Sequence, residues 1–290
     1  MSIDLHVDYP WQCYKNSSHL SLDGSTLLQC DFPRMDKGGL DKFIAALYLH
    51  DNTQKTIGPD KSWNAIRNQI GICKGYSDRV MIALEGGRLL NGDVARLAEL
   101  QGAGCVYITL THNQNTDWAD SATDKMQHNG LTAQGKSLVK LIQAGGIFVD
   151  LSHASDQTAL DVISLSTKPL LATHSGVRSL VDHPRNLSDF LIKEIVATGG
   201  LIGVPYASRF VRDADGVVEA IDHIANIAGN TDHIGIGSDL DGADTIIGDV
   251  SGWSAVLEPL SDLGYTADQI ADIKGGNFLR LLNDARPKES

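Results

Sequence analysis

The sequence has no uninterrupted apolar run that approaches the ~20 residues needed to span a membrane as a helix. Met1 is followed almost at once by the stretch IDLHVD, which leaves no room for a secretory leader, and the terminal NDARPKES shows no anchor signal. We therefore expect a cytoplasmic protein with no membrane partner.

Cysteine is scarce, and no two cysteines have the C-x-x-C spacing of a redox or metal motif. The four are Cys13, Cys30, Cys73 and Cys105, and a chain of 290 residues builds a core without disulfides, so we expect reduced thiols. Runs of Lys and Arg are also absent, and the formal net charge is -12. Such an acidic chain disfavours nucleic acid as a partner. Homodimer formation stays open.

The sequence does contain a regular alternation of short aliphatic runs with longer amphipathic stretches. The runs predict strands at 2–8, 43–50, 79–85, 105–112, 147–153, 169–175, 201–206 and 233–239. Helical patterns fall at 92–102, 131–146, 187–200, 214–229 and 266–282. Eight strands that alternate with helices predict an α/β fold: one (β/α)8 TIM-type barrel in a single domain, 1–290. The aperiodic segment 9–42 is predicted to be a loop over the barrel mouth.

Six of the eight predicted strands finish on residue types that bind metals. These residues are His6, Asp8, Glu85, His112, His153, His174 and Asp239. Each alone could be a hydrogen-bonded histidine or a helix cap. In this fold, however, the carboxyl ends of the strands converge on the active site. Histidines and carboxylates buried together need a compensating cation, and this mixture favours zinc or a related metal, with a bridging carboxylate allowing two ions.

Nine motifs carry a resemblance that spans nearly the whole chain. They are IDLHVDYPW, FPRMDKGGLDKF, ALEGG, YITLTHNQNTDWADS, GLTAQGKSLV, VDLSHASD, THSGVRSLVDHPRNLSD, IGIGSDLDG and GGNFLRLL. In this order they resemble the membrane (renal) dipeptidase family of zinc metallopeptidases, which belongs to the amidohydrolase-like superfamily of barrels.

The resemblance implies a ligand set for two zinc ions. His6 and Asp8 would hold one ion, His153 and His174 would hold the other, and Glu85 would bridge both. The first motif reads HVD where the family more often has HND, a change that keeps both ligand types. We therefore expect two Zn²⁺ per chain.

The resemblance also implies the roles of residues beyond the ligands. His112 and Arg185 would contact the substrate, and an arginine can grip a carboxylate with its planar fork. Asp239 and the bridging Glu85 would be catalytic, with Asp239 moving the proton. His50 departs from the family pattern, and it either reshapes the pocket or is a solvated loop residue.

The activity implied by the resemblance is that of a zinc dipeptidase that cleaves the amide bond of small dipeptides and tolerates a D-residue at their C-terminal position. One alternative is another metal-dependent hydrolase of the same barrel, such as a lactonase or an N-acyl-D-amino-acid deacylase. A second is a non-catalytic barrel that keeps metal for stability or binds a peptide without cleaving it. Asp239 argues against the second, because that role would not require it.

Overall fold

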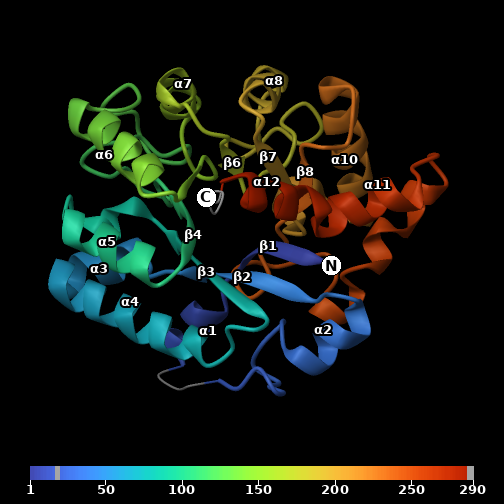
Figure 1. The fold of residues 1–290 in the computed structure, drawn as a ribbon, viewed down its shortest axis with the longest axis horizontal. Helices are drawn as coiled ribbons and strands as arrows, with labels where there is room; N and C mark the ends of the chain where they lie inside the picture. The colour runs from blue at the N-terminus through green and yellow to red at the C-terminus, as the bar shows by residue number, and fades with distance from the viewer. Residues whose placement is uncertain (17–19, 286–290) are drawn as a thin grey trace, which may run out of the picture.

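The computed structural model describes residues 1–16 and 20–285, whose strands form one closed parallel barrel. The strands are β1 (Ile3–Val7), β2 (Lys42–Leu47), β3 (Val80–Glu85), β4 (Cys105–Thr109), β5 (Phe148–Asp150), β6 (Leu171–Ala172), β7 (Leu201–Val204) and β8 (Ile234–Ile236). They follow one another around the barrel in sequence order, and β8 pairs back with β1 (Figure 1). The predicted (β/α)8 TIM-type barrel is confirmed.

Helices surround the barrel on its outside (Figure 1). They are α1 (Tyr9–Lys15), α2 (Phe32–Gly38), α3 (Asp51–Ile57), α4 (Pro59–Lys74), α5 (Val94–Gly102), α6 (Ala133–Ala144), α7 (Asp156–Leu165), α8 (Asp189–Ala197), α9 (Ser208–Val211), α10 (Ala214–Ala228), α11 (Ala267–Ala271) and α12 (Asn277–Ala285). Shorter helical segments are η1 (Gly87–Leu90), η2 (Val250–Gly252), η3 (Ala255–Ser261) and η4 (Asp272–Gly276). None of the helices in the described ranges is both long and apolar enough to cross a membrane.

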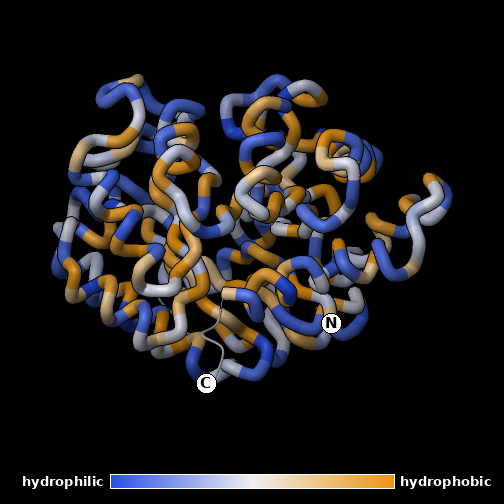
Figure 2. Tube along the Cα trace, turned by 45° about the horizontal axis from the view of Figure 1, so that its top comes forward, coloured by the Kyte–Doolittle hydropathy of each residue, from blue (hydrophilic) through white to orange (hydrophobic). Residues whose placement is uncertain are grey.

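Apolar side chains fill the barrel interior and the layer between the strands and the helices. The outer helices alternate between hydrophobic and hydrophilic residues along their turns, as amphipathic helices do (Figure 2). All four cysteines are free and buried within these layers, which agrees with the expected reduced thiols.

The segment from residue 9 to residue 42 is not the single loop that its lack of periodicity predicted. It contains α1, which has Pro10 in its first turn, where a missing N–H costs nothing. It also contains α2, where the Asp31 side chain caps the first turn and Gly39 ends the helix in a left-handed conformation. Each helix has only seven residues, which is too short for an apolar period to be recognised.

The stretch predicted as one helix over 266–282 is broken into three pieces. It opens with the expected capping box of Thr266 and Gln269. The helix then breaks near Gly275, where a Cβ atom would lie 2.6 Å from the carbonyl oxygen of Met1. After the break, Phe278 of α12 packs with apolar residues from the starts of the strands, so α12 covers the amino end of the barrel. The opposite, carboxyl end remains available for a site.

The close approach of β6 and β7 depends on the absence of a side chain at Gly203. A Cβ atom there would lie 1.9 Å from the carbonyl oxygen of Thr173. We expect Gly203→Ala to lower the free energy of unfolding by ~1–3 kcal/mol, because the backbone must shift to make room. Gly71→Ala is the matched control, since Gly71 lies in α4 with no atom within 4 Å of its Cβ position. That change should raise the free energy by ~0.5–1 kcal/mol.

Urea unfolding of both variants measures these changes. A Gly203→Ala variant as stable as the wild type would show that the barrel has room at this contact.

Candidate active site

The predicted site residues lie at the carboxyl end of the barrel, mostly in loops that begin where the strands end. Only His6 and Glu85 lie within strands, in β1 and at the end of β3. The others lie one to three residues beyond the strand that precedes them, because the strands are shorter than the apolar runs predicted; these are Asp8, His112, His153, His174 and Asp239. His112 and Asp239 are partly exposed, and the rest are buried.

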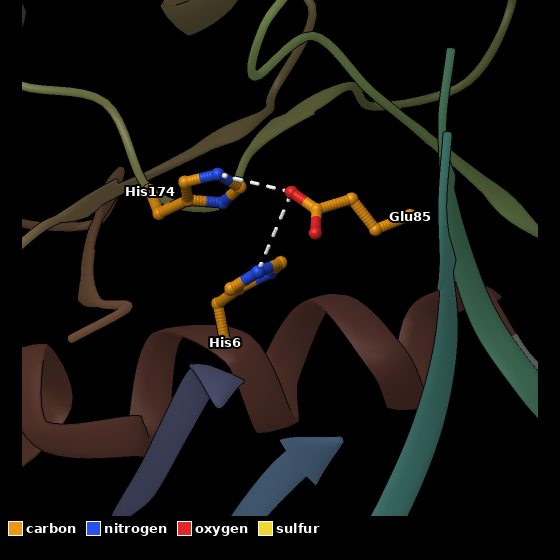
Figure 3. Close-up of side chains that lie close together, drawn as sticks. All are labelled: His6, Glu85 and His174. Atoms are coloured by element: carbon orange, nitrogen blue, oxygen red, sulfur yellow. Dashed lines mark ion pairs between the residues drawn. The ribbon is translucent and has the colours of Figure 1, made fainter. Parts of the chain in front are cut away.

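One carboxylate oxygen, Oε1 of Glu85, lies at the centre of the cluster. It is 3.6 Å from Nε2 of His6, 3.2 Å from Nε2 of His153 and 3.6 Å from Nε2 of His174. Figure 3 shows Glu85 pointing between the rings of His6 and His174. Oδ2 of Asp8 lies 3.6 Å from Nε2 of His6. Two ligands that each lie about 2.1 Å from one tetrahedral zinc ion are about 3.4 Å apart, so these spacings suit shared cations.

Two ring nitrogens that face this carboxylate make no hydrogen bond. Nε2 of His6 and Nε2 of His174 are buried without a hydrogen bond, which costs about 1–3 kcal/mol for each such group. Potential ligand atoms lie within 4.8 Å of one another in three sets: His6, Glu85 and His174; Glu85, His112 and His153; His6, Asp8 and Asp239. The sets share members, so they form one continuous cluster. Its donors and its unpartnered nitrogens fit zinc-class ions.

The protonation states of His153, His174 and Glu85 also suit metal binding. Burial lowers the pKa of His153 and His174 well below the usual value, and the nearby Arg185 acts in the same direction. Both rings are therefore neutral at pH 7, which is the form that binds a metal. Burial opposes the ionised form of Glu85, but His6 and His153 outweigh it and hold the pKa of Glu85 well below its usual value.

A tyrosine hydroxyl determines which nitrogen of His6 carries the proton. The Tyr107 hydroxyl lies 2.7 Å from the carbonyl oxygen of Leu5 and 2.8 Å from Nδ1 of His6. The hydroxyl has one proton, which it donates to the carbonyl, because that oxygen can only accept. Nδ1 of His6 must then be the donor to the hydroxyl oxygen. In the neutral ring, the lone pair of His6 is therefore on Nε2, the nitrogen that faces Glu85. Burial opposes the charged form of His6, but Tyr107 and Glu85 outweigh it and raise its pKa well above the usual value, so a metal ion at Nε2 would displace a proton.

The ring of His174 is oriented by a similar chain of two hydrogen bonds. Its Nδ1 lies 3.0 Å from the hydroxyl of Thr173, which in turn donates to Oδ2 of the buried Asp150 at 3.0 Å. Asp150 also accepts from the hydroxyl of Thr109 at 2.6 Å. Since a carboxylate only accepts, the Thr173 proton points to Asp150, and Nδ1 of His174 is the donor to Thr173. Hydrogen bonds of this kind to the far side of a ring fix its tautomer and direction.

Two of the site residues have left-handed backbone conformations, which are strained for residues with a side chain. The φ angle is 67° at His153 and 65° at Asp239. In the loop that holds Asp239, a Cβ atom at Gly242 would lie 2.0 Å from Oδ2 of Asp8, so only glycine fits there. Strain of this kind is tolerated where the surrounding structure holds a functional side chain in place.

Asp239 lies at the edge of the cluster with its carboxylate free. It accepts no hydrogen bond from any residue that the structure describes. Burial, followed by the charge of Asp8, raises the pKa of Asp239 to about 7. The potential ligand atoms of Asp239, His6 and Asp8 all lie within 4.8 Å of one another. A cation in the cluster would oppose this rise by favouring the ionised form.

A pocket of about 500 Å³ opens above the cluster, and Asp8, Glu85, His153 and Asp239 line its floor. Arg185 lines its wall and is 4% exposed. One of its amino groups donates to the carbonyl oxygen of His174 at 3.3 Å, while its Nε has no partner. No described carboxylate lies within ion-pairing distance of it. Burial lowers its pKa to about 10, so Arg185 is a buried, charged and unpaired cation at pH 7.

The pocket wall opposite includes His112, Tyr48 and His50. Nδ1 of His112 lies 3.1 Å from Oδ2 of the buried Asp51 and 3.3 Å from the Tyr48 hydroxyl, so its ring is held in place from behind. His50 caps α3 by accepting from the backbone N–H of Asn52 at 3.2 Å, and it also lines the pocket. His50 was predicted either to reshape the pocket or to be a solvated loop residue. It lines the pocket and is exposed, so each prediction describes part of its position.

Four residues that support the site were not among those predicted: Asp4, Asp51, Tyr107 and Asp150. Asp4 is fully buried in β1 and accepts from the Trp253 ring N–H at 2.6 Å and from the backbone N–H groups of Ser238 and His6. One signal for it existed, since Asp4 is an acidic residue within the apolar run of the first predicted strand. Nothing in the sequence marks Asp51 or Tyr107, whose partners are distant along the chain.

The barrel and its strand-end cluster define the molecule as a (β/α)8 barrel with a site suited to metal ions. A sequence profile of the membrane dipeptidase family (peptidase family M19) matches residues 74–289. The chain therefore belongs to this family.

Individual relatives agree with this assignment. An uncharacterized dipeptidase of Schizosaccharomyces pombe is 34% identical over 211 residues, which are 69% of this chain and 52% of the relative. The chain thus spans about half the length of that curated relative. A dipeptidase of the same peptidase family has a TM-score of 0.89 at 23% identity, covering 98% of both chains. A metallopeptidase from Rhodobacter sphaeroides, liganded with a phosphinate mimic of the dipeptide L-Ala-D-Ala, has a TM-score of 0.87 at 22% identity, covering 98% of this chain and 99% of its own.

The role of Tyr107 in setting the His6 tautomer gives a measurable expectation. Tyr107→Phe removes the acceptor for Nδ1–H and keeps the ring. We expect the zinc affinity of the metal-free protein to fall by ~10- to 100-fold, because the imidazole is then free to turn and to move its proton to Nε2. Tyr265→Phe is the matched control, since the Tyr265 hydroxyl bonds Asp222 on the outer helices.

Titration with zinc against a competing chelator measures the affinity. An unchanged affinity in Tyr107→Phe, equal to that of Tyr265→Phe, would mean that this hydroxyl does not prepare His6 for the metal.

Proposed function

We propose that the protein is a binuclear zinc dipeptidase whose single domain spans residues 1–290. The observation that carries the proposal is the position of Glu85, whose one oxygen faces three imidazole nitrogens at 3.2–3.6 Å on the floor of a pocket. His6 and Asp8 would hold one ion, His153 and His174 the other, and Glu85 both. When bound, such ions supply Lewis acidity that polarises an amide carbonyl and makes water a better nucleophile.

Arg185 would bind the terminal carboxylate of the dipeptide. It is buried, it has no carboxylate partner among the described residues, and its Nε is unsatisfied. A substrate carboxylate would supply the missing acceptor and counter-charge, and a guanidinium can bind it through two parallel hydrogen bonds. His112, held by Asp51, would contact the substrate on the opposite wall.

Asp239 would move the proton during cleavage. Water adds to the amide carbonyl carbon and loses a proton to the Asp239 carboxylate. The C–N bond then breaks, and the same proton passes to the leaving nitrogen. The free carboxylate of Asp239 beside the cluster supports this role, because no hydrogen bond from a described residue competes for it.

Tolerance of a D-residue at the C-terminal position is also part of the proposal. The support is the fold shared with the Rhodobacter sphaeroides metallopeptidase, which binds a mimic of L-Ala-D-Ala. In this chain the pocket beside Arg185 has a volume of about 500 Å³, which is room for a small dipeptide whose second residue has either configuration.

Metal analysis combined with substrate profiling tests the proposal as a whole. We expect close to two zinc-class ions per chain, loss of activity on chelation, and recovery when zinc is added back. The zinc-loaded protein should cleave members of a dipeptide library in preference to lactones and N-acyl-D-amino acids. Preferred turnover of a lactone or an N-acyl amino acid would move the protein to another hydrolase class, and no turnover of any of them would favour a binding role.

Two near-isosteric changes separate metal binding from proton transfer. Asp239→Asn should keep most of the metal but lower kcat by ~10²- to 10⁴-fold, the usual contribution of a general acid-base group. Glu85→Gln should lose metal, thermal stability and activity together, because it weakens the shared ligand. Metal content measured beside kcat distinguishes the two. Full activity in Asp239→Asn, or metal loss as complete as in Glu85→Gln, contradicts the assigned role.

A further inference from the structure

The pocket wall that holds Arg185 holds a second arginine, Arg209. It lies in the short helix α9, which follows β7, and it lines the same pocket. The guanidinium carbon of Arg209 is 5.4 Å from the centre of the Phe210 ring, and that of Arg185 is 5.3 Å from the same centre. Both cations therefore lie beside the same phenylalanine ring and line the same pocket.

Arg209 differs from most of the other described arginines in having no acidic partner. In the described part of the chain, seven arginines ion-pair with a carboxylate within 4.0 Å: Arg34, Arg67, Arg79, Arg88, Arg96, Arg178 and Arg212. Arg185 and Arg209 do not, and Arg280 instead donates to Asn277 and to the carbonyl oxygen of Asp232. The chain has a net charge of -12, yet Arg185 and Arg209 on the pocket wall are not paired with any described acid. Both are therefore available to an anionic ligand.

The floor of the pocket has the opposite charge. Asp8, Glu85 and Asp239 line the floor, where the proposed ions would bind. His183 lines the same pocket, and its Nδ1 accepts from the backbone N–H of Arg185 at 3.1 Å. Burial, then Arg185 and Arg209, lowers the pKa of His183, so this ring adds no charge at pH 7. A ligand with acidic groups at one end is thereby directed with that end toward the two arginines.

We propose that this pocket selects dipeptides whose C-terminal residue carries a second carboxylate, that is, dipeptides ending in aspartate or glutamate. Arg185 binds the main-chain carboxylate and Arg209 binds the side-chain carboxylate. This specificity rests on the proposed dipeptidase function and adds a substrate class to it. Arg209 is exposed to water, so its contribution is that of a charge-assisted hydrogen bond at the pocket rim.

The test compares two dipeptides that differ only in charge, Ala-Asp and Ala-Asn, each with an L- or a D-residue at the C-terminal position. With the zinc-loaded protein, kcat/KM should be ~10-fold or more higher for Ala-Asp in the preferred configuration. Arg209→Gln should bring this ratio close to one, and Arg209→Lys should keep part of it, since it keeps the charge. Arg212→Gln is the matched control, because Arg212 lies three residues further on and is paired with Glu219. That variant should keep the wild-type ratio.

The outcomes separate this inference from the function on which it rests. If dipeptides are cleaved but the wild-type ratio is near one, or if Arg209→Gln keeps the wild-type ratio, the acidic specificity is wrong and the dipeptidase function stands. If neither these nor any other dipeptides are cleaved by the zinc-loaded protein, both proposals fail together.

Discussion

The site depends on one constraint, which is the negative charge of Glu85 buried at the mouth of a closed barrel. A buried carboxylate needs compensation, and two of the three imidazoles that face it, His153 and His174, are neutral at pH 7. The nitrogens and the carboxylate therefore need the same thing, a cation between them. Family membership agrees with this conclusion from the geometry, since the chain belongs to the membrane dipeptidase family.

The polar residues beneath the cluster orient the rings around Glu85 and take no part in the proposed reaction. The hydroxyls of Tyr107 and Thr173 accept hydrogen bonds from Nδ1–H of His6 and His174. In the neutral form of each ring, the lone pair on Nε2 is then directed at Glu85. Asp150 and Asp4 anchor these groups and the neighbouring backbone in the barrel interior. Since each of these polar atoms is satisfied by another, the barrel holds a polar layer without the cost of unpaired buried groups. The pocket above the cluster adds positive charge, because Arg185 and Arg209 have no acidic partner among the described residues.

Much of the fold could be predicted because its signals are local. Each strand is a short aliphatic run, and each long helix has an amphipathic period, so eight repeats of this alternation indicate a barrel. The helices α1 and α2 were missed because seven residues are too few to display a period. The regular strands end earlier than the apolar runs, because buried apolar residues such as Leu110 and Leu151 continue each run past the last regular strand residue. The polar strand ends were nevertheless located correctly along the chain.

The sequence by itself determined the fold class, the order of the elements and the types of residue at the strand ends, since these follow from local pattern and motif. Only the tertiary structure decided which atoms meet. It selected one oxygen of Glu85 as the common neighbour of three rings, assigned the protons of His6 and His174, and left Arg185 and Arg209 without acidic partners. These features arise between residues that are far apart in the sequence. Closure of the barrel brings them together, and no local pattern records such distances.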